Sequence, residues 1–547
     1  SHSSPNGNGF SLQFYKTSLK KERLTLKTIG IVAEYNPFHN GHKYQIEQTK
    51  KQLGADNVVV VMSGNFVQRG GVAWTDKYLR TKMAIDCGAD FVFELPTVFA
   101  CASAETFALG SVALLDSLGF VDEICFGSEE GNLEILEKIS SILNSNDYIK
   151  ELEIYLKKGI SFPVAREEYL KQHMPQYRDI LPTLLKQPNN ILGIEYIKAL
   201  KRIGSHIKPV TIKRIDNGYH STSLDSTPTL SDNTCNLIPN RNMQNTNKNV
   251  CCSPDSKKEI YLSDKENNKF SSASAIRTSF EKLNFFSDIN KKEAALTTIT
   301  THVPEPVINI LKNNLTRFPA DNPLFSDMLY FKLLSLKKED MPLGIYSDIS
   351  PELSDRIYNN LPHYKGFDNF ADILKTKQYT HTRITRVLTH ILLDIKKEDI
   401  ELFITKLYPN RDKPLTKNSQ ADEHDKNITV FMPTLAYARL LGMNKNKSGL
   451  LRNIKNIPLI TKVADADKSF ERFLSQFQTD NVFSKKPAQA NESNGNNAVS
   501  ITDKQHLQYM KQLQKMFKYD LFAADLYRFC THNHVPDEYR AGVYILH

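Results

Sequence analysis

The sequence predicts an α/β protein, with a doubly wound parallel sheet in the N-terminal half and a mainly helical C-terminal region. Short apolar runs alternate with stretches of helical periodicity from Thr28 to about Leu143. Strands that alternate with helices favour right-handed βαβ units. From about Lys291 onward, apolar residues recur at helical spacing instead. A chain of 547 residues exceeds one ordinary hydrophobic core, so two or more domains are expected.

The predicted strands of the N-terminal half are short runs of β-branched and aromatic residues, as in parallel sheets that are buried on both faces. They are Thr28–Glu34, Asn57–Met62, Asp90–Leu95 and Val121–Phe126, with a further strand at Pro209–Arg214. Helices are predicted at Lys43–Leu53, Tyr78–Cys87, Ala104–Leu118, Leu133–Leu143 and Ile191–Leu200. Asp76 and Ser103 precede two of these helices and are candidate N-caps. Ligands of such folds bind beyond the carboxyl ends of the strands, where His39, Ser63, Pro96 and Gly127 lie.

The C-terminal region has its clearest helical patterns at Phe325–Leu336, Ile384–Lys396 and Gln505–Cys530. Three polar segments interrupt the chain and are interpreted as insertions without a packed core: 217–271, 412–427 and 479–500. Residues 1–25 are interpreted as a disordered leader or tag and are set aside from the fold prediction.

The composition indicates a globular protein of the reducing cytoplasm. Hydrophobic residues make up 40% of the chain, and the formal net charge of +9 is a mild bias towards polyanionic partners. The seven cysteines are odd in number and show no CxxC pair, which argues against a disulfide framework and against a structural zinc site. No apolar run is long enough to span a bilayer, so no membrane partner is expected.

The stretch from Ile29 to His42 carries the strongest chemical signal. An apolar strand is stopped by Pro37, Asn40-Gly41 favours a turn, and a helical pattern begins at Lys43. The free N–H groups and positive dipole of a helix start bind phosphate. Gly41 lets a phosphate approach the backbone, and His39 and His42 can donate hydrogen bonds to phosphoryl oxygens as pyrophosphate leaves. A turn with two solvated histidines, or a metal-binding pair, would have the same HxxH spacing.

The segment AEYNPFHNGH resembles the HxGH phosphate loop of the nucleotidyltransferase superfamily, and its fuller form EYNPFHNGH is similar to the tRNA(Met) cytidine acetate ligase family. Further segments fit this family in order, from Thr28 to Arg277: Val61–Gly70, Phe93–Pro96, Cys125–Glu129, Pro188–Gly193 and Ser272–Arg277. The resemblance implies a nucleotidyltransferase (HUP/Rossmann-like) ATP-binding domain at 26–285. It leaves a helical domain at 286–547, for which tRNA binding is a hypothesis.

The implied activity is that of an ATP-dependent carbon–nitrogen ligase. Acetate would attack the α-phosphate of ATP to give acetyl-adenylate, and the wobble cytidine of elongator tRNA(Met) would then be acetylated to N4-acetylcytidine. Mg²⁺ is expected as the counterion of ATP, without a protein metal site. A different adenylyl- or cytidylyltransferase of the superfamily and a non-catalytic RNA-binding protein are the alternatives. The length of the C-terminal half argues against the first, and the intact His39/His42 pair argues against the second.

The expected catalytic residues are His39 and His42. The expected ATP-binding residues are those of the loop and five later positions: Val32, Ala33, Glu34, Tyr35, Asn36, Pro37, Phe38, His39, Asn40, Gly41, His42, Gly127, Asn189, Arg214, Ser274 and Arg277. From the residues alone, Asn189 and Ser274 could equally belong to helix caps, and Arg214 to a surface ion pair.

Three further groups of residues are candidates with ordinary alternatives. Gln68 and Arg69 could face a carboxylate or phosphate, or lie in a plain surface loop. Lys77 could neutralise phosphate, although a solvated lysine is more common. Lys377, Arg383 and Arg386 lie among aromatic residues at a helix start and are predicted to contact tRNA; a solvated basic helix face is the alternative.

Overall fold

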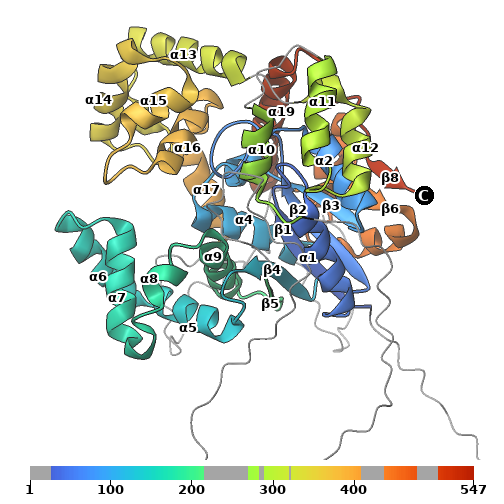
Figure 1. Cartoon of the computed structure of the whole chain (residues 1–547), viewed down its shortest axis with the longest axis horizontal. Helices are drawn as coiled ribbons and strands as arrows, with labels where there is room; N and C mark the ends of the chain where they lie inside the picture. The colour runs from blue at the N-terminus through green and yellow to red at the C-terminus, as the bar shows by residue number, and fades with distance from the viewer. Residues whose placement is uncertain (1–25, 215–268, 282–288, 319–321, 408–436, 477–502) are drawn as a thin grey trace, which may run out of the picture.

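The computed structural model describes residues 26–214, 269–281, 289–318, 322–407, 437–476 and 503–547 (Figure 1). The predicted leader 1–25 and the polar segments 412–427 and 479–500 lie outside the described residues, as does the 217–268 part of the first insertion. Residues 269–271, the end of that insertion, are described and adjoin the site discussed below.

A single mixed sheet forms the centre of the protein, in the order β5-β4-β1-β2-β3-β6-β7, with β8 paired to β6. The first five strands run parallel to one another and are β1 Thr28–Ala33, β2 Asn57–Ser63, β3 Phe91–Leu95, β4 Glu123–Ser128 and β5 Lys208–Lys213. Each lies within two residues of its predicted bounds at either end. The predicted α/β fold class, with a parallel sheet and a helical C-terminal region, is therefore confirmed.

Three strands come from the C-terminal region, which was predicted to be mainly helical and in which the sequence analysis named no strand. They are β6 Ala438–Asn444, antiparallel to β3, and the short β7 Leu459–Ile460 and β8 Tyr544–Leu546. β7 and β8 are too short for a periodic pattern to identify. β6 pairs with the edge of β3 that would otherwise be unpaired. This tertiary contact explains why β6 is a strand, and the sequence of β6 alone does not indicate it.

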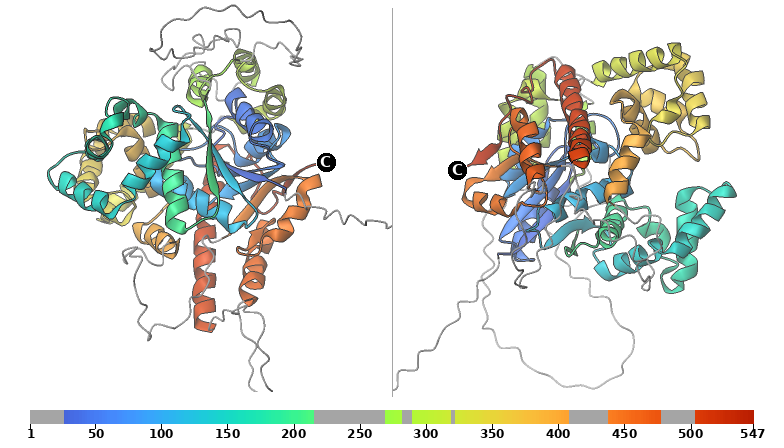
Figure 2. Two further views of the ribbon diagram at one scale, coloured as in Figure 1. Left: turned by 90° about the horizontal axis from the view of Figure 1, so that it is seen from below. Right: turned by 180° about the vertical axis from the view of Figure 1, so that it is seen from behind.

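Two helical layers cover the sheet because alternate residues of a strand point to opposite faces. Val59 and Val61 of β2 belong to one hydrophobic cluster, and Val58, Val60 and Met62 belong to the other. Figures 1 and 2 show the helices around the sheet. In the N-terminal half these are α1 Asn40–Lys51, α2 Lys77–Asp86, α3 Thr97–Ala100, α4 Ala104–Ser117, α5 Leu133–Leu143, α6 Asn146–Lys157, α7 Phe162–His173, α8 Leu181–Leu184 and α9 Pro188–Ile203.

The later helices are α10 Ala273–Glu281, α11 Ile289–Ile299, α12 Glu305–Lys312, α13 Asn322–Lys338, α14 Pro351–Asn360, α15 Phe367–Leu374, α16 His381–Leu392, α17 Lys397–Leu407, α18 Ala466–Ser475 and α19 Asp503–Cys530. Of these, α10 to α12 pack near α1 and α2, whereas α13 to α17 form a lobe of their own (the 322–407 lobe). A second lobe, α6 to α8 (the 146–184 lobe), lies on the same side of the sheet in Figure 1.

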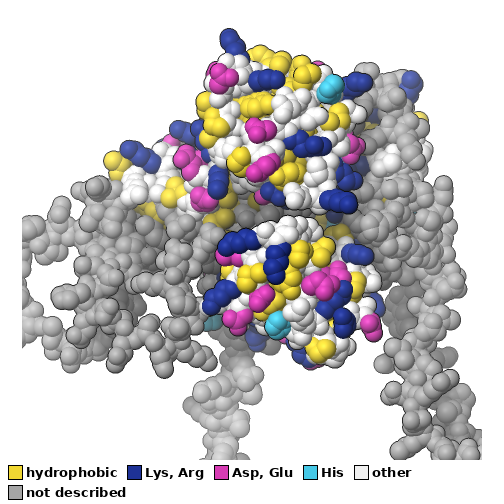
Figure 3. Space-filling view, turned by 90° about the vertical axis from the view of Figure 1, so that its left-hand side faces the viewer, with side chains coloured by type: hydrophobic (Ala, Val, Ile, Leu, Met, Phe, Trp, Pro, Cys, Tyr) yellow, Lys and Arg dark blue, Asp and Glu magenta, His cyan; other side chains and the backbone are white. Residues whose placement is uncertain are grey.

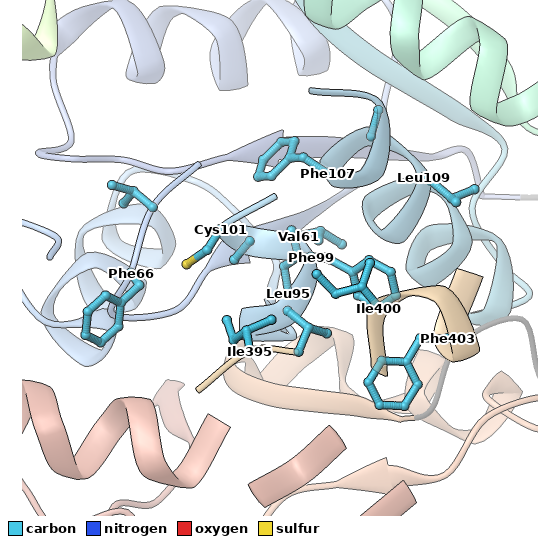
Figure 4. Close-up of a cluster of buried hydrophobic side chains, with 14 of the residues drawn as sticks. Val61, Phe66, Leu95, Phe99, Cys101, Phe107, Leu109, Ile395, Ile400 and Phe403 are labelled. Carbon is cyan, nitrogen blue, oxygen red and sulfur yellow. The ribbon is translucent and has the colours of Figure 1, made fainter. Parts of the chain in front are cut away.

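The 322–407 lobe is joined to the sheet through apolar packing and through α16. Figure 4 shows Ile395, Ile400 and Phe403 packed beside Leu95 and Phe99 of the N-terminal half. Thr389 of α16 accepts a hydrogen bond from the Gly71 amide (2.8 Å), and Thr385 donates to the Arg69 carbonyl oxygen. These bonds fix the loop after β2 against the lobe.

The predicted N-caps are confirmed. Asp76 accepts hydrogen bonds from the amides of Tyr78 and Leu79 at the start of α2, and Ser103 accepts from Thr106 at the start of α4. In the described part of the chain, no helix combines the length and apolar character that crossing a membrane requires. Cys87, Cys101, Cys125 and Cys530 are buried as free thiols.

Candidate active site

The chain passes from β1 into α1 through a tight turn in which His39 is the N-cap. Tyr35 takes a positive φ of 50° in this turn, and His39 is extended at φ −138°. The His39 side chain accepts a hydrogen bond from the Gly41 amide at 3.1 Å. A Cβ on Gly41 would lie 2.9 Å from Cε1 of His39, so the folded imidazole itself requires glycine at this position.

His39 and His42 hold each other in one arrangement. The His39 amide donates to Nδ1 of His42 (3.2 Å), and the two rings stack at a centroid distance of 3.6 Å. Because Nδ1 accepts a hydrogen bond in both residues, the proton of each neutral imidazole is assigned to Nε2. Neither Nε2 atom has a hydrogen-bond partner among the described residues. The loop therefore presents two Nε2–H donors for a ligand.

Both imidazoles are neutral in the free protein. Burial, with the positive charges of Arg214 and Arg277 as smaller causes, lowers the pKa of His39 to about 3. Burial also lowers the pKa of His42 well below its ordinary value, with His39 and Arg214 as further causes. An anion bound next to these rings would raise both histidine pKa values, because it would balance the positive charge of the arginines.

Residues distant in sequence anchor the loop. The Asn40 side-chain amide donates to the carbonyl oxygens of Lys269 (3.0 Å) and Thr301 (2.9 Å). Arg277 of α10 donates to the Asn36 carbonyl oxygen and to Ser274 Oγ (3.3 Å). The second predicted phosphate motif, at the start of α10, is thus brought beside the first.

The carboxyl ends of β4 and β5 form the opposite wall. A Cβ on Gly127 would lie 3.2 Å from Cγ of Arg214, so the aliphatic part of Arg214 lies against the Gly127 backbone. Asn189, in the first turn of α9, donates from its amide to Glu129 Oε1 at 2.6 Å, and Glu129 also accepts from the Asn190 amide. Capping of α9 by Asn189, the alternative that its sequence position allowed, does not occur, because Gln187 is the N-cap residue.

Arg80 is a structural residue of the site that sequence reasoning missed. Its fully buried guanidinium donates to the carbonyl oxygens of Thr75 (2.9 Å), Glu34 (2.7 Å) and Ser63 (3.0 Å), and also to that of Gly64. Arg80 therefore ties the exits of β1 and β2 together. Its sequence context in α2 resembles an ordinary amphipathic helix, so no local signal marks it.

A cavity of about 510 Å³ lies at the carboxyl end of the sheet, a size typical of small-ligand sites. The predicted ATP-binding residues that line it are Val32, Ala33, Glu34, Tyr35, Asn36, His39, His42, Gly127, Asn189, Arg214, Ser274 and Arg277. Pro37, Phe38, Asn40 and Gly41 do not line it, and neither do Ser63 and Pro96. Gln68 and Arg69 do, together with residues that no sequence pattern singled out: Gln45, Phe107, Tyr196, Phe325, Phe367 and Asp368.

Lys77 is a buried structural residue. The sequence suggested either a lysine that neutralises phosphate or a solvated lysine, and both interpretations were wrong. Its side chain is 1% exposed and pairs with Glu94 (2.7 Å) and Glu538 (3.0 Å). Arg439 of β6 completes this buried network by pairing with the same two carboxylates. The network links β3 to the C-terminal segment of the chain.

The predicted tRNA-contacting residues lie at and before the start of α16. Lys377 is exposed, whereas Arg383 pairs with Asp348 (3.7 Å) and lies over the Tyr379 ring. The Arg386 side chain is only 12% exposed and also pairs with Asp348 (3.7 Å). Figure 3 shows the outer faces of the two lobes, where basic and acidic side chains are intermixed. Among the described residues, no group of three or more His, Cys, Asp or Glu side chains could hold a metal ion.

Comparisons with known proteins identify the family of this chain. A family model described as HIGH Nucleotidyl Transferase matches residues 26–235 and 240–428. A tRNA(Met) cytidine acetate ligase of Acetivibrio thermocellus is 34% identical over 460 residues, which cover 82% of this chain and 92% of that protein. A protein of the same name from Clostridium novyi is 32% identical and covers 79% of this chain and 89% of its own.

A solved structure shares the fold. The crystal structure of Thermotoga maritima TmcAL bound with alpha-thio ATP matches with a TM-score of 0.68 at 24% identity, covering 95% of this chain and 99% of that one. The sequence relatives and the family model cover most of this chain. The chain therefore belongs to the tRNA(Met) cytidine acetate ligase family and carries a HIGH nucleotidyltransferase domain.

Proposed function

We propose that this chain is an ATP-dependent ligase that acetylates the wobble cytidine of elongator tRNA(Met) to N4-acetylcytidine. One observation carries the proposal: two neutral imidazoles, each with Nε2–H available, line a cavity that also contains Arg214 and Arg277. This donor set suits a triphosphate whose charge increases on bridging oxygens as pyrophosphate leaves. Membership of the family supplies acetate, cytidine and tRNA(Met) as the other reactants.

In the first step, an acetate oxygen attacks the α-phosphorus of ATP, and the bond to pyrophosphate breaks. The Nε2–H groups of His39 and His42 donate to phosphoryl oxygens, and Arg277 neutralises charge from the α10 side. Acetate is itself the nucleophile, so no side chain has to form a covalent intermediate. Holding acetate and α-phosphate in line supplies the remaining acceleration.

Mg²⁺ would accompany ATP as its counterion. Without a carboxylate cage among the described residues, the ion would be held mainly by phosphate oxygens and water, as is common for Mg²⁺. The predicted residues Lys377, Arg383 and Arg386 are proposed to contact the tRNA backbone, with ATP bound in 26–285 and tRNA approached from 286–547. A cytoplasmic location follows from such a substrate and agrees with the buried free thiols.

The test of this function is incubation of the full chain with ATP, ¹⁴C-acetate and unmodified elongator tRNA(Met), followed by digestion to nucleosides. Labelled N4-acetylcytidine that depends on ATP and on acetate is the expected product. Label recovered in another nucleoside, or none in tRNA while ATP is consumed, would contradict the proposal.

A further inference from the structure

The cavity has a second wall that the adenylation step does not use. The 322–407 lobe contributes Phe325, Phe367 and Asp368 to it. Phe367 lies beside the loop after β2, because a Cβ on Gly71 would be 3.9 Å from its Cε1 atom. Thr389 holds that loop from α16. This wall is therefore a fixed part of the site.

Asp368 is the only carboxylate that this second wall contributes among the described residues. It lies in the first turn of α15 and makes no hydrogen bond or ion pair with a described residue. Asp372, one turn later, instead pairs with His381 at 3.6 Å. The dipole of α15 favours a carboxylate at Asp368, in the first turn of the helix. The dipole does not explain why this carboxylate borders the cavity beside two aromatic rings.

The surroundings of Asp368 suit a proton acceptor. Asp368 is exposed, yet the protein around it raises its carboxyl pKa by reducing solvation; His381 lowers the pKa and Asp372 raises it. Phe325 and Phe367, buried at 2% and 9% exposure, meet at a ring-centroid distance of 5.0 Å and give this side of the cavity an aromatic lining. Flat bases extruded from RNA are commonly held against such surfaces.

We propose that Asp368 binds the exocyclic amine of the target cytosine and accepts its proton during acetyl transfer. This proposal rests on the proposed function. A carboxylate accepts a hydrogen bond from cytosine N4, whereas the O4 atom of uracil would be repelled. Gln68 and Arg69, on the adjoining loop, also line the cavity, and the Gln68 side chain donates to the Ala102 carbonyl oxygen at 3.2 Å.

Acetyl transfer joins cytosine N4 to the acetyl carbon and releases AMP. The N4 lone pair attacks the carbonyl carbon of acetyl-adenylate, and the new C–N bond forms. The bond between that carbon and the phosphate oxygen breaks, and AMP leaves with the electron pair. One N4 proton passes to the Asp368 carboxylate and later to water. Cytosine N4 is a weak nucleophile, so a positioned base is worth about a hundredfold or more in rate.

The experiment compares Asp368→Asn with Asp372→Asn, a matched change one turn along the same helix. Two rates are measured for each: acetate-dependent exchange of labelled pyrophosphate into ATP, and single-turnover formation of N4-acetylcytidine on unmodified tRNA(Met). For Asp368→Asn, we expect acetylcytidine formation to fall about a hundredfold relative to exchange. Its rate should also lose the dependence on a group that deprotonates at acidic pH. Asp372→Asn should retain both rates at neutral pH and keep the acid limb of the profile, moved to lower pH because Asp372 no longer raises the Asp368 pKa.

Acetylcytidine formation by Asp368→Asn at the unsubstituted rate would overturn the assignment. Equal losses in exchange and in acetylcytidine formation would overturn it as well, because they indicate a role in adenylation or in folding. Failure of the unsubstituted chain to form acetylcytidine is a separate result and contradicts the proposed function itself.

Discussion

The backbone amide of His39 donates to Nδ1 of His42 at 3.2 Å, and this bond decides which nitrogen of His42 faces the cavity. It converts a short HxxH spacing into a pair of Nε2–H donors with fixed tautomers. A metal-binding pair, one of the alternatives for this spacing, would need the lone pairs of those nitrogens directed at the ion instead. The geometry therefore favours an oxygen-rich anion as the ligand.

Replacing His42 by Ala should lower acetate-dependent pyrophosphate exchange into ATP by about a hundredfold or more. Removal of one preorganised donor to a developing oxyanion typically costs this much. His173→Ala, on the distant helix α7, is the control and should exchange at the unsubstituted rate. An exchange rate in His42→Ala equal to that of the control would refute the role of the imidazole.

Stability should fall as the solution is acidified below about pH 6.5, in part because of His39. The unfolded chain protonates this histidine near 6.5, whereas burial holds its folded pKa at about 3, so the unfolded state binds more protons in that interval. His39→Asn retains an N-cap acceptor but cannot titrate. It should remove up to about 1.4 kcal/mol per pH unit from the slope of the unfolding free energy. The measurement is the urea midpoint of each protein between pH 4.5 and 7.5. Identical slopes of midpoint against pH in the two proteins would contradict this role of His39.

Arg80→Lys should raise the KM for ATP as well as destabilise the fold. A lysine cannot reach all four carbonyl oxygens. Buried acceptors at the exits of β1 and β2 would lose their hydrogen-bond partners, and each unsatisfied acceptor lowers the free energy of unfolding by about 1–3 kcal/mol. Arg356→Lys is a matched control, because Arg356 donates to the carbonyl oxygens of Ile373 and Leu374 within the 322–407 lobe. The control should lose stability without a change in KM. Equal KM values for ATP in the two variants would show that Arg80 does not position the ATP site.

Replacing Lys377, Arg383 and Arg386 together by Ala should weaken tRNA binding and reduce its salt dependence. The slope of log affinity against log salt should fall by about 1 for each phosphate contact removed. The control removes the exposed Lys150, Lys157 and Lys158 of the 146–184 lobe, an equal change in charge. Because Arg386 is largely buried, a Lys377/Arg383 double variant checks that any loss is not a folding defect. Unchanged tRNA affinity in the triple variant would dispose of the hypothesis.

Sequence patterns predicted the parts of this protein that local chemistry dictates. β1 to β5 are continuous apolar runs, and Asp76 and Ser103 cap helices because their side chains bond to amides two or three residues away. The HxGH loop was equally readable, since the turn, the glycine and both histidines are contiguous. In each case the partner that fixes the residue lies within a few positions of it.

Contacts between distant segments account for what the sequence did not predict. Lys77 is buried because Glu94 and Glu538 surround it, and nothing near position 77 identifies either partner. Asp368 joins the cavity only because α16 fixes the 322–407 lobe against the loop after β2. β6 is a strand because β3 has a free edge. The roles of these residues depend on tertiary contacts. A local sequence pattern does not reveal such contacts.

The central claim is that the start of α1 holds the triphosphate of ATP so that a carboxylate can displace pyrophosphate. A crystal structure of this protein with a non-hydrolysable ATP analogue tests it most directly. We expect phosphate oxygens within hydrogen-bond distance of Nε2 of both His39 and His42, with Arg277 on the same phosphates. An analogue bound outside this cavity, or one whose phosphates face away from the two imidazoles, would contradict it.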